Sequence, residues 1–115
     1  MKYLISTRTT NGANARTHWR VRAKKAKSER AMAAWELTQN RPPLLPARIT
    51  LTRIAPRSLD AHDGLPISFK HIVDGIADAY GVRDNTPLIE WRYAQRRGEP
   101  RQYAVEIEIE TVGRQ

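Results

Sequence analysis

Residues 65–81, LPISFKHIVDGIADAYG, form the stretch that decides the fold of this chain. Large apolar side chains recur there every three or four residues, at Leu65, Phe69, Ile72, Val73, Ile76 and Tyr80. This spacing places them on one face of an α-helix. Pro66 suits the first helical turn, and Gly81 suits the position just past the last turn. The stretch therefore predicts an amphipathic helix over residues 65–80.

Alternating apolar and polar residues on either side of this helix predict four strands. The clearest alternation is near the C-terminus, where Val105, Ile107 and Ile109 are separated by glutamates. The predicted strands cover residues 3–5, 47–54, 88–93 and 103–112. Residues 96–100, RRGEP, predict a hairpin loop that joins the last two strands.

A second and longer helix is predicted over residues 17–38, which lack Gly and Pro and are rich in Ala, Arg, Lys and Glu. Its expected apolar anchors are Ala31, Met32, Ala34 and Trp35. A flexible loop over residues 7–17 precedes it, and a proline-rich turn over residues 40–46 follows it. The predicted order is β-α-β-α-β-β, a single α+β domain over residues 1–115 with helices packed on a mixed sheet.

The composition fits a globular domain rather than a disordered or membrane chain, with 40% hydrophobic and 28% charged residues among 115. No apolar run approaches the ~20 residues that span a bilayer. The apolar part of the N-terminus is too short for a secretory signal. The absence of cysteine excludes a disulfide framework and a thiolate metal site. We therefore expect a cytoplasmic protein.

Positive charge is concentrated in the first half of the chain. Residues 1–57 hold 13 Lys/Arg and 2 acidic residues, whereas residues 58–115 hold 7 and 10, which gives the formal net charge of +8. A basic half of this kind is typical of proteins that bind a polyanion, although a basic surface can also serve solubility. Candidate contacts to backbone phosphates are Asn14, Arg16, His18, Arg20, Arg22, Lys24, Lys25 and Lys27. Trp19 is the best candidate for stacking on a base.

Asp60, Asp63, Lys70 and Asp84 are the most distinctive group in the chain. Carboxylates gathered in a cationic protein favour a divalent cation held against a polyanion, and oxygen ligands suit Mg²⁺. A nearby lysine can stabilise negative charge that develops on a phosphate. Asp63 could instead cap the helix that follows it. His62 could be a metal ligand, a proton carrier or a surface loop residue.

The two loops that carry these aspartates flank the predicted helix over residues 65–80. A helix of that length is ~24 Å long, so its two ends cannot meet on an isolated helix. Asp84 can join the other aspartates if the loops curl over the helix, or if one subunit completes the site of another in a symmetric dimer. Asp74 and Asp78 predict a solvated or salt-linked helix face, on which Asp74 can pair with Lys70.

These segments resemble the RusA-type Holliday-junction resolvases. The resemblance lies in LDAHDGL at 59–65, FK at 69–70, VDGIADAYGV at 73–82 and IEW at 89–91. The segment from Asn11 to Trp19 is also similar, more weakly, to the opening loop of the family. It implies a homodimeric, Mg²⁺-dependent endonuclease of bacterial or phage origin that cuts four-way DNA junctions in recombination and repair. On the matching positions, Asp60, Asp63 and Asp84 would bind metal and Lys70 would support catalysis.

The chain departs from the family pattern at three points. Gly64 stands where the family usually has Asn, the upstream pair is Asp60-x-x-Asp63 rather than Asp-x-Asp, and Arg83 replaces the first acid of the pair that ends at Asp84. A non-catalytic DNA-binding protein of the same fold, with a degenerate active site, is therefore the alternative prediction. An RNA-binding accessory protein is a third interpretation.

Overall fold

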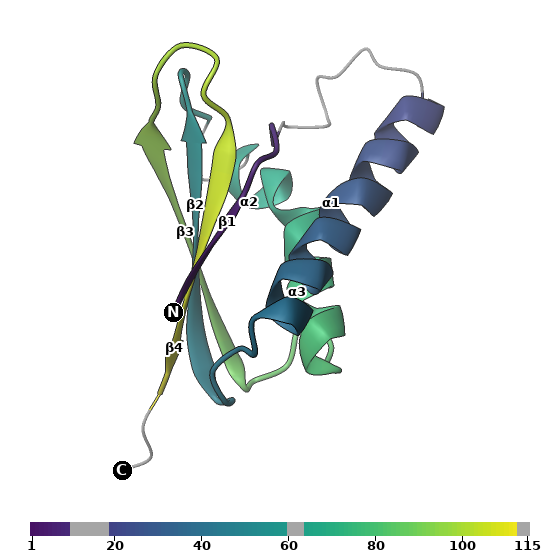
Figure 1. Cartoon of the computed structure of the whole chain (residues 1–115), viewed down its shortest axis with the longest axis vertical. Coiled ribbons are helices and arrows are strands. Elements are labelled where there is room, and N and C mark those ends of the chain that lie inside the picture. The colour runs from purple at the N-terminus through teal and green to yellow at the C-terminus, as the bar shows by residue number, and fades with distance from the viewer. Residues whose placement is uncertain (10–18, 60–63, 113–115) are drawn as a thin grey trace.

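A mixed sheet with helices on one of its faces makes up the fold (Figure 1). The computed structural model describes residues 1–9, 19–59 and 64–112, which contain four strands and three helices. In chain order these are β1 (Lys2–Ile5), α1 (Trp19–Gln39), β2 (Ala47–Ala55), α2 (Gly64–Ser68), α3 (Lys70–Tyr80), β3 (Ile89–Arg97) and β4 (Ala104–Thr111). The predicted α+β class, with helices packed on a mixed sheet, is confirmed. None of these helices is both long and apolar enough to cross a bilayer.

The strand order is β1-β4-β2-β3, and it corrects one prediction. β2 pairs in parallel with β3 and antiparallel with β4, so β3 and β4 lie on opposite sides of β2. The predicted hairpin at residues 96–100 is therefore wrong, because residues 98–103 pass over the end of β2. β4 and β2 are the two interior strands, and every residue of β2 is wholly or partly buried.

The helix predicted over residues 65–80 is interrupted at Phe69, where α2 ends and α3 begins. The Ser68 hydroxyl donates a hydrogen bond to the Leu65 carbonyl oxygen (2.7 Å) in the last turn of α2. The predicted apolar face is confirmed, since its members from Leu65 to Ile76 are buried and the ring of Phe69 is fully enclosed. Gly81 ends α3 in a left-handed conformation with φ of 70°, as predicted.

The buried face of α1 differs in part from the predicted one, since of the expected anchors Met32 packs against the core. Ala33 and Leu37 are completely buried, whereas Trp35 is 62% exposed. The reason is the close approach of α1 to α3 at Gly75, where an added Cβ would lie 2.2 Å from the Arg30 carbonyl oxygen and 2.8 Å from the Cβ of Ala33. Only a small side chain fits this contact, so Ala33 faces α3 and Trp35 turns outward.

The N-terminal half of α1 extends beyond α3 (Figure 1). Buried side chains in α1 begin at Glu29, and the described side chains before it are exposed or half-buried. Figure 1 places these N-terminal turns toward the same end of the molecule as the C-terminal ends of β2 and β3. The basic half of α1 and the ends of two parallel strands therefore lie on one side of the fold.

The face of the sheet opposite the helices is open to water (Figure 1). On β4, Val105, Ile107 and Ile109 face the helices and are fully buried, so the glutamates between them point to the open face. Two ion pairs on this face join neighbouring strands, Lys2–Glu108 (3.5 Å) and Arg48–Glu90 (2.5 Å), and a third, Arg92–Glu90 (3.1 Å), lies within β3. The helix-covered face therefore carries the core, and the open face carries paired charges.

Candidate functional site

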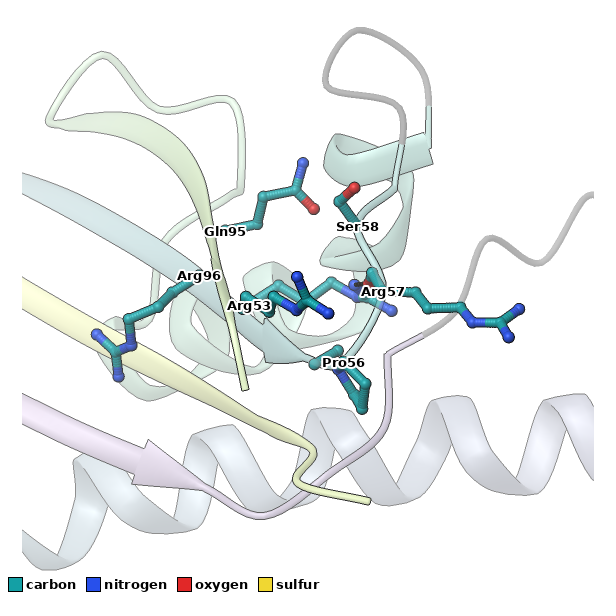
Figure 2. Close-up of a pocket in the computed structure, with 8 residues that line it drawn as sticks. Arg53, Pro56, Arg57, Ser58, Gln95 and Arg96 are labelled. Atoms are coloured by element: carbon teal, nitrogen blue, oxygen red, sulfur yellow. Dashed lines mark hydrogen bonds between the residues drawn. The ribbon is translucent and has the colours of Figure 1, made fainter. Parts of the chain in front are cut away.

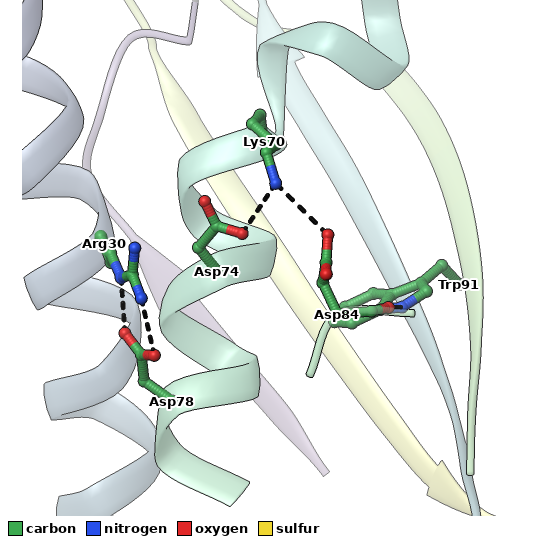
Figure 3. Close-up of polar contacts among 6 residues, drawn as sticks. All are labelled: Arg30, Lys70, Asp74, Asp78, Asp84 and Trp91. Atoms are coloured by element: carbon green, nitrogen blue, oxygen red, sulfur yellow. Dashed lines mark hydrogen bonds and ion pairs between the residues drawn. The ribbon is translucent and has the colours of Figure 1, made fainter. Parts of the chain in front are cut away.

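Lys70 meets two carboxylates beside α3 (Figure 3). The Nζ of Lys70 lies 3.0 Å from Oδ1 of Asp74 and 3.3 Å from Oδ2 of Asp84. Asp74 is one turn along α3, so the predicted pairing with Lys70 is confirmed. Asp84 belongs to the segment after α3, and it reaches Lys70 within a single chain. This part of the predicted site needs no second subunit.

Two features of the sequence bring Asp84 back to Lys70. The interruption at Phe69 leaves α3 with 11 residues, about 16 Å, instead of the ~24 Å of the predicted helix. At its other end, the left-handed Gly81 reverses the chain, since glycine takes this conformation at little cost. The indole Nε1 of Trp91 then donates a hydrogen bond to the Asp84 carbonyl oxygen (2.8 Å), which fixes Asp84 beside β3.

The charge state of Lys70 is set by its carboxylate partners. The hydrogen bond to Asp74 raises the pKa of Lys70 above its ordinary value of 10.5, and Asp84 adds to this effect while partial burial opposes it. Lys70 is therefore a cation at neutral pH. It can stabilise negative charge on a phosphate, but it cannot act as a proton acceptor there.

An aromatic contact holds the start of α3 against β3. The ring of Tyr93 stacks on Phe69, the residue before Lys70, with centroids 5.5 Å apart and planes 15° apart. Burial raises the pKa of Tyr93, and the charge of Asp84 raises it further, so the phenol stays neutral. The stacked pair positions the first turn of α3, and with it Lys70.

Gln95 holds the residue that precedes the aspartate loop. Its side-chain oxygen accepts a hydrogen bond from the Leu59 N–H (2.9 Å), and its Nε2 donates one to the Leu59 carbonyl oxygen (2.8 Å). Both backbone polar groups of Leu59 are thus bound by one side chain of β3. The segment that follows Leu59 starts from a fixed point.

Two of the predicted metal ligands, Asp60 and Asp63, lie outside the described residues, and so does His62. The two flanking residues are described: Leu59 is held by Gln95, and Gly64 is the first residue of α2. Within the described ranges, no group of three or more His, Asp or Glu side chains is placed to hold a metal ion. Asp84 is the predicted ligand whose position the structure gives.

One row of side chains on β3 therefore organises the site. Trp91, Tyr93 and Gln95 are alternate residues on the helix-covered face, and neighbours in such a row are about 6.8 Å apart. Trp91 binds Asp84 and Gln95 binds Leu59, so these two attachments are roughly 14 Å apart along the strand. Sequence reasoning missed this row. Alternation in residues 88–93 predicted the strand, but no local pattern indicates what its side chains contact.

The chemistry of the carboxylates fits a hard divalent cation. Asp74 and Asp84 already place oxygen atoms on one positive charge, the Lys70 ammonium, so this position favours a cation. The side chain of Asp84 is 46% exposed and can be reached from solvent. Carboxylate oxygens are the ligands that Mg²⁺ takes in proteins. Of the predicted ligands, Asp84 is therefore the described one that could offer a carboxylate oxygen to such a cation.

The described candidates for phosphate contacts on α1 lie at the surface. The side chains of Arg20, Arg22, Lys24 and Lys27 are exposed, and that of Lys25 is half-buried and donates a hydrogen bond to the Arg8 carbonyl oxygen. Asn14, Arg16 and His18, and the side chain of Trp19, lie outside what the structure describes.

The salt-linked face predicted for α3 is also confirmed. The guanidinium of Arg30 on α1 donates two hydrogen bonds to the carboxylate of Asp78, of 2.6 and 2.8 Å (Figure 3). This pair lies on the side of α3 that faces α1 and does not contact Lys70. Asp78 therefore joins the two helices and stands apart from the candidate site.

No model of a known protein family matches this chain, and no curated protein matches it.

Proposed function

We propose that this chain is a Mg²⁺-dependent, structure-specific DNA endonuclease that resolves four-way junctions by paired incisions, in recombination and repair. The observation that best supports this proposal is the contact between Lys70 and Asp84. Trp91 of β3 binds Asp84, and Gln95 of the same strand binds Leu59. Leu59 leads directly into the segment of Asp60 and Asp63. The resemblance to RusA-type resolvases gives these residues their roles.

In this proposal the carboxylates of Asp60, Asp63 and Asp84 would hold Mg²⁺, and the ion would supply an activated water and offset charge on the leaving oxygen. Lys70 stabilises the negative charge that develops on the scissile phosphate, and its raised pKa keeps it protonated for this purpose. Asp74 holds the Lys70 ammonium through a separate contact of 3.0 Å. Lys70 therefore stays in place when Asp84 is engaged elsewhere.

Binding of DNA is assigned to the basic half of α1 and the loop before it. Contacts to backbone phosphates carry no base information, so recognition depends on the shape of the junction rather than on its sequence. Paired incisions need two active sites, which a two-fold homodimer would supply. The exposed face of α1 is large enough to run along a DNA strand, since 21 residues of helix span about 30 Å.

The test is incubation of the protein with an end-labelled four-way junction in Mg²⁺. We expect symmetric nicks in two opposing strands, no nicks in a linear duplex of the same sequence, and no nicks with EDTA. Asp84→Asn is the inactive variant. Asp78→Asn is its matched control, because it removes one carboxylate from α3 that does not contact Lys70. If folded protein binds the junction but leaves it uncut, the proposal of a nuclease is overturned.

A non-catalytic DNA-binding protein of the same fold is the second candidate. It is favoured by the ion pairs, because each of Asp74, Asp78 and Asp84 has a basic partner. Asp63→Asn separates the two candidates. The nuclease loses cleavage and keeps junction binding, whereas the binding protein shows no cleavage before or after the substitution.

A further inference from the structure

A pocket of about 450 Å³ opens at the C-terminal ends of β2 and β3 (Figure 2). Four of the residues that line it are arginines: Arg53, Arg57, Arg96 and Arg97. No acidic residue is among its described lining residues. We call it the arginine pocket. Its composition favours an anionic ligand. None of the aspartates of the candidate site is among its described lining residues.

Arg53 is a buried cation, only 7% exposed. Its Nη1 donates a hydrogen bond to the Arg57 carbonyl oxygen (2.6 Å), and its Nε donates a longer one to the Thr9 carbonyl oxygen (3.4 Å). A guanidinium has five N–H donors, and within residues 1–9, 19–59 and 64–112 the remaining ones have no acceptor. No carboxylate in those ranges forms an ion pair with Arg53. An anion in the pocket would supply the missing opposite charge.

The energetic state of Arg53 supports the same conclusion. Burial lowers its pKa from the ordinary value, and the positive charge of Arg8 lowers it further. A buried charge is costly unless an opposite charge accompanies it. An anion beside Arg53 would offset both the free-energy cost of burying this charge and the repulsion from Arg8.

The sheet places Arg53 at the right position for a ligand site. It continues the buried row of β2 on the helix-covered face, and it lies opposite Gln95 in the parallel pairing with β3. Arg97 is the next residue of β3 on that face. The C-terminal ends of adjacent parallel strands are where open α/β sheets bind ligands. Figure 2 shows Arg53 between Gln95 and Arg57, with the side chains of Arg57 and Arg96 extending outward to either side.

The arginine pocket adjoins both parts of the surface assigned to DNA. Gln95 lines the pocket and also binds Leu59, next to the aspartate loop. On the other side, Arg8 is close enough to repel Arg53, and its guanidinium lies 4.7 Å from the ring centroid of Tyr103. Lys25 of α1 donates a hydrogen bond to the Arg8 carbonyl oxygen. Positive charge therefore runs from α1 through Arg8 to the pocket.

We propose that the arginine pocket binds a phosphodiester of the DNA backbone that lies outside the scissile step. Guanidinium groups suit this ligand because their planar N–H donors match phosphate oxygens. The identity of the ligand as DNA rests on the proposed function. The pocket thus positions the DNA strand beyond the metal site, while Lys70 contacts the phosphate that is cut.

Arg57→Gln and Arg97→Gln test the pocket, because Arg53 is buried and its replacement would also disturb folding. Arg41→Gln is the matched control, since it removes one exposed positive charge in the turn before β2, at the opposite end of that strand. Junction affinity is measured by fluorescence anisotropy in EDTA over a series of salt concentrations. Each test variant should weaken binding by about 5–30-fold and reduce the slope of log K against log salt by about one. The control should change affinity by less than ~2-fold.

Single neutral methylphosphonates in the junction then identify the phosphate. We expect one position at which the substitution weakens binding to the wild type but not to Arg97→Gln, while other positions behave alike in both proteins. Equal losses at every position, or unchanged slopes in both test variants, would overturn the pocket. A last experiment adds inorganic phosphate at constant ionic strength. If phosphate competes with the junction for the wild type but not for Arg97→Gln, the pocket is a site for free phosphate, and the assignment to the DNA backbone is overturned.

These outcomes are separate from those of the cleavage assay. If the wild type does not nick junctions but both arginine substitutions weaken binding, the result supports the arginine pocket and excludes the nuclease proposal. If the wild type nicks junctions and Arg57→Gln, Arg97→Gln and Arg41→Gln bind alike, the result supports the nuclease proposal and excludes the pocket.

Discussion

The side-chain amide of Gln95 binds both backbone polar groups of Leu59, through hydrogen bonds of 2.9 and 2.8 Å. Among the described strands, β3 lies at one edge of the sheet and pairs with β2 alone. The side-chain amide of Gln95 gives both backbone polar groups of Leu59 a partner on β3. The segment of Asp60 and Asp63 is thereby attached to the same strand that holds Asp84.

Gln95→Leu should impair cleavage more than junction binding, because Gln95 lines the arginine pocket but carries no charge for a phosphate. The substitution keeps a side chain of similar size and removes both hydrogen bonds to Leu59, at a cost in the free energy of unfolding of about 1–2 kcal/mol. If the anchor places the metal ligands, the Mg²⁺ concentration for half-maximal cleavage should rise by about tenfold, because small displacements of reacting groups are costly. Single-turnover cleavage over a Mg²⁺ series measures this.

Gln102→Leu is the control for that variant. The Gln102 side chain accepts a hydrogen bond from the Glu99 N–H (2.8 Å) in the loop between β3 and β4, away from Leu59. It should leave the Mg²⁺ dependence unchanged. If the two glutamine variants have the same Mg²⁺ dependence, Gln95 has a role in stability alone.

Asp84→Asn should reduce cleavage by ~100-fold or more, since it removes a charged metal ligand. Junction affinity should stay the same or increase, because one negative charge near the DNA is lost. The pKa of Lys70 should fall toward 10.5, since Asp84 is one of the groups that raise it. Cleavage rates, junction affinity and NMR titration of the Lys70 side chain measure the three effects. Loss of affinity together with cleavage would argue against a purely catalytic role.

Glu29→Gln should change how stability depends on pH. Burial raises the pKa of Glu29 above 4.5, although the hydrogen bond from Thr7 (3.0 Å) and the charges of Lys25 and His71 oppose the shift. The unfolded chain therefore loses this proton at lower pH than the folded chain, and the wild type loses stability as pH rises from about 4.5 through the raised pKa. The glutamine keeps the acceptor for Thr7 and has no such loss.

Urea unfolding at pH 4, 6 and 8 measures this difference. The advantage of Glu29→Gln over the wild type should grow with pH and become constant above the raised pKa. Glu99→Gln, at an exposed loop position, is the matched control. An advantage that is independent of pH, or that shrinks as pH rises, would contradict the assignment to Glu29.

Gly75→Ala should separate α1 from α3. The new Cβ would lie 2.2 Å from the backbone carbonyl oxygen of Arg30, which cannot move as a flexible side chain can. Overpacking of this kind costs about 1–3 kcal/mol, and the better helix propensity of alanine returns at most about 1 kcal/mol. We expect a net loss of roughly 2 kcal/mol in urea unfolding.

Gly81→Ala is the comparison for Gly75→Ala. An added Cβ at Gly81 meets no atom within 4 Å, so its cost comes from the backbone conformation at φ of 70° alone. That cost should be about 1 kcal/mol. A loss at Gly75 that is no larger than the loss at Gly81 would show that the two helices can part without penalty.

The elements of the fold could be predicted where one face of an element is buried. Alternation at Val105, Ile107 and Ile109 predicts β4 within a residue at each end, because all three side chains are fully buried. The partners of the strands could not be predicted, since a loop such as residues 96–100 can close a hairpin or pass over one strand. The buried face of α1 was mispredicted for a related reason, because the close contact at Gly75 selects Ala33 over the larger Trp35.

The candidate site could be predicted where it is local. The spacing of Lys70 and Asp74 on one helix indicates their pairing. The contact between Lys70 and Asp84 depends on the interruption at Phe69 and the reversal at Gly81, which act together only in the folded chain. The contact between Gln95 and Leu59 joins residues 36 positions apart, and no local pattern indicates it.

The paired charges on the open face of the sheet affect how the molecule meets a polyanion. Four acidic residues there, Glu90, Glu106, Glu108 and Glu110, balance four basic ones, Lys2, Arg48, Arg92 and Arg96. The excess positive charge of the chain must therefore reside elsewhere, which makes the distribution of charge strongly one-sided. A molecule of this kind is turned by the field of a polyanion before contact, so it arrives with the helix-covered side in front. Salt weakens this turning, because the Debye length falls to about 8 Å at 0.15 M, and the rate of association should fall with it.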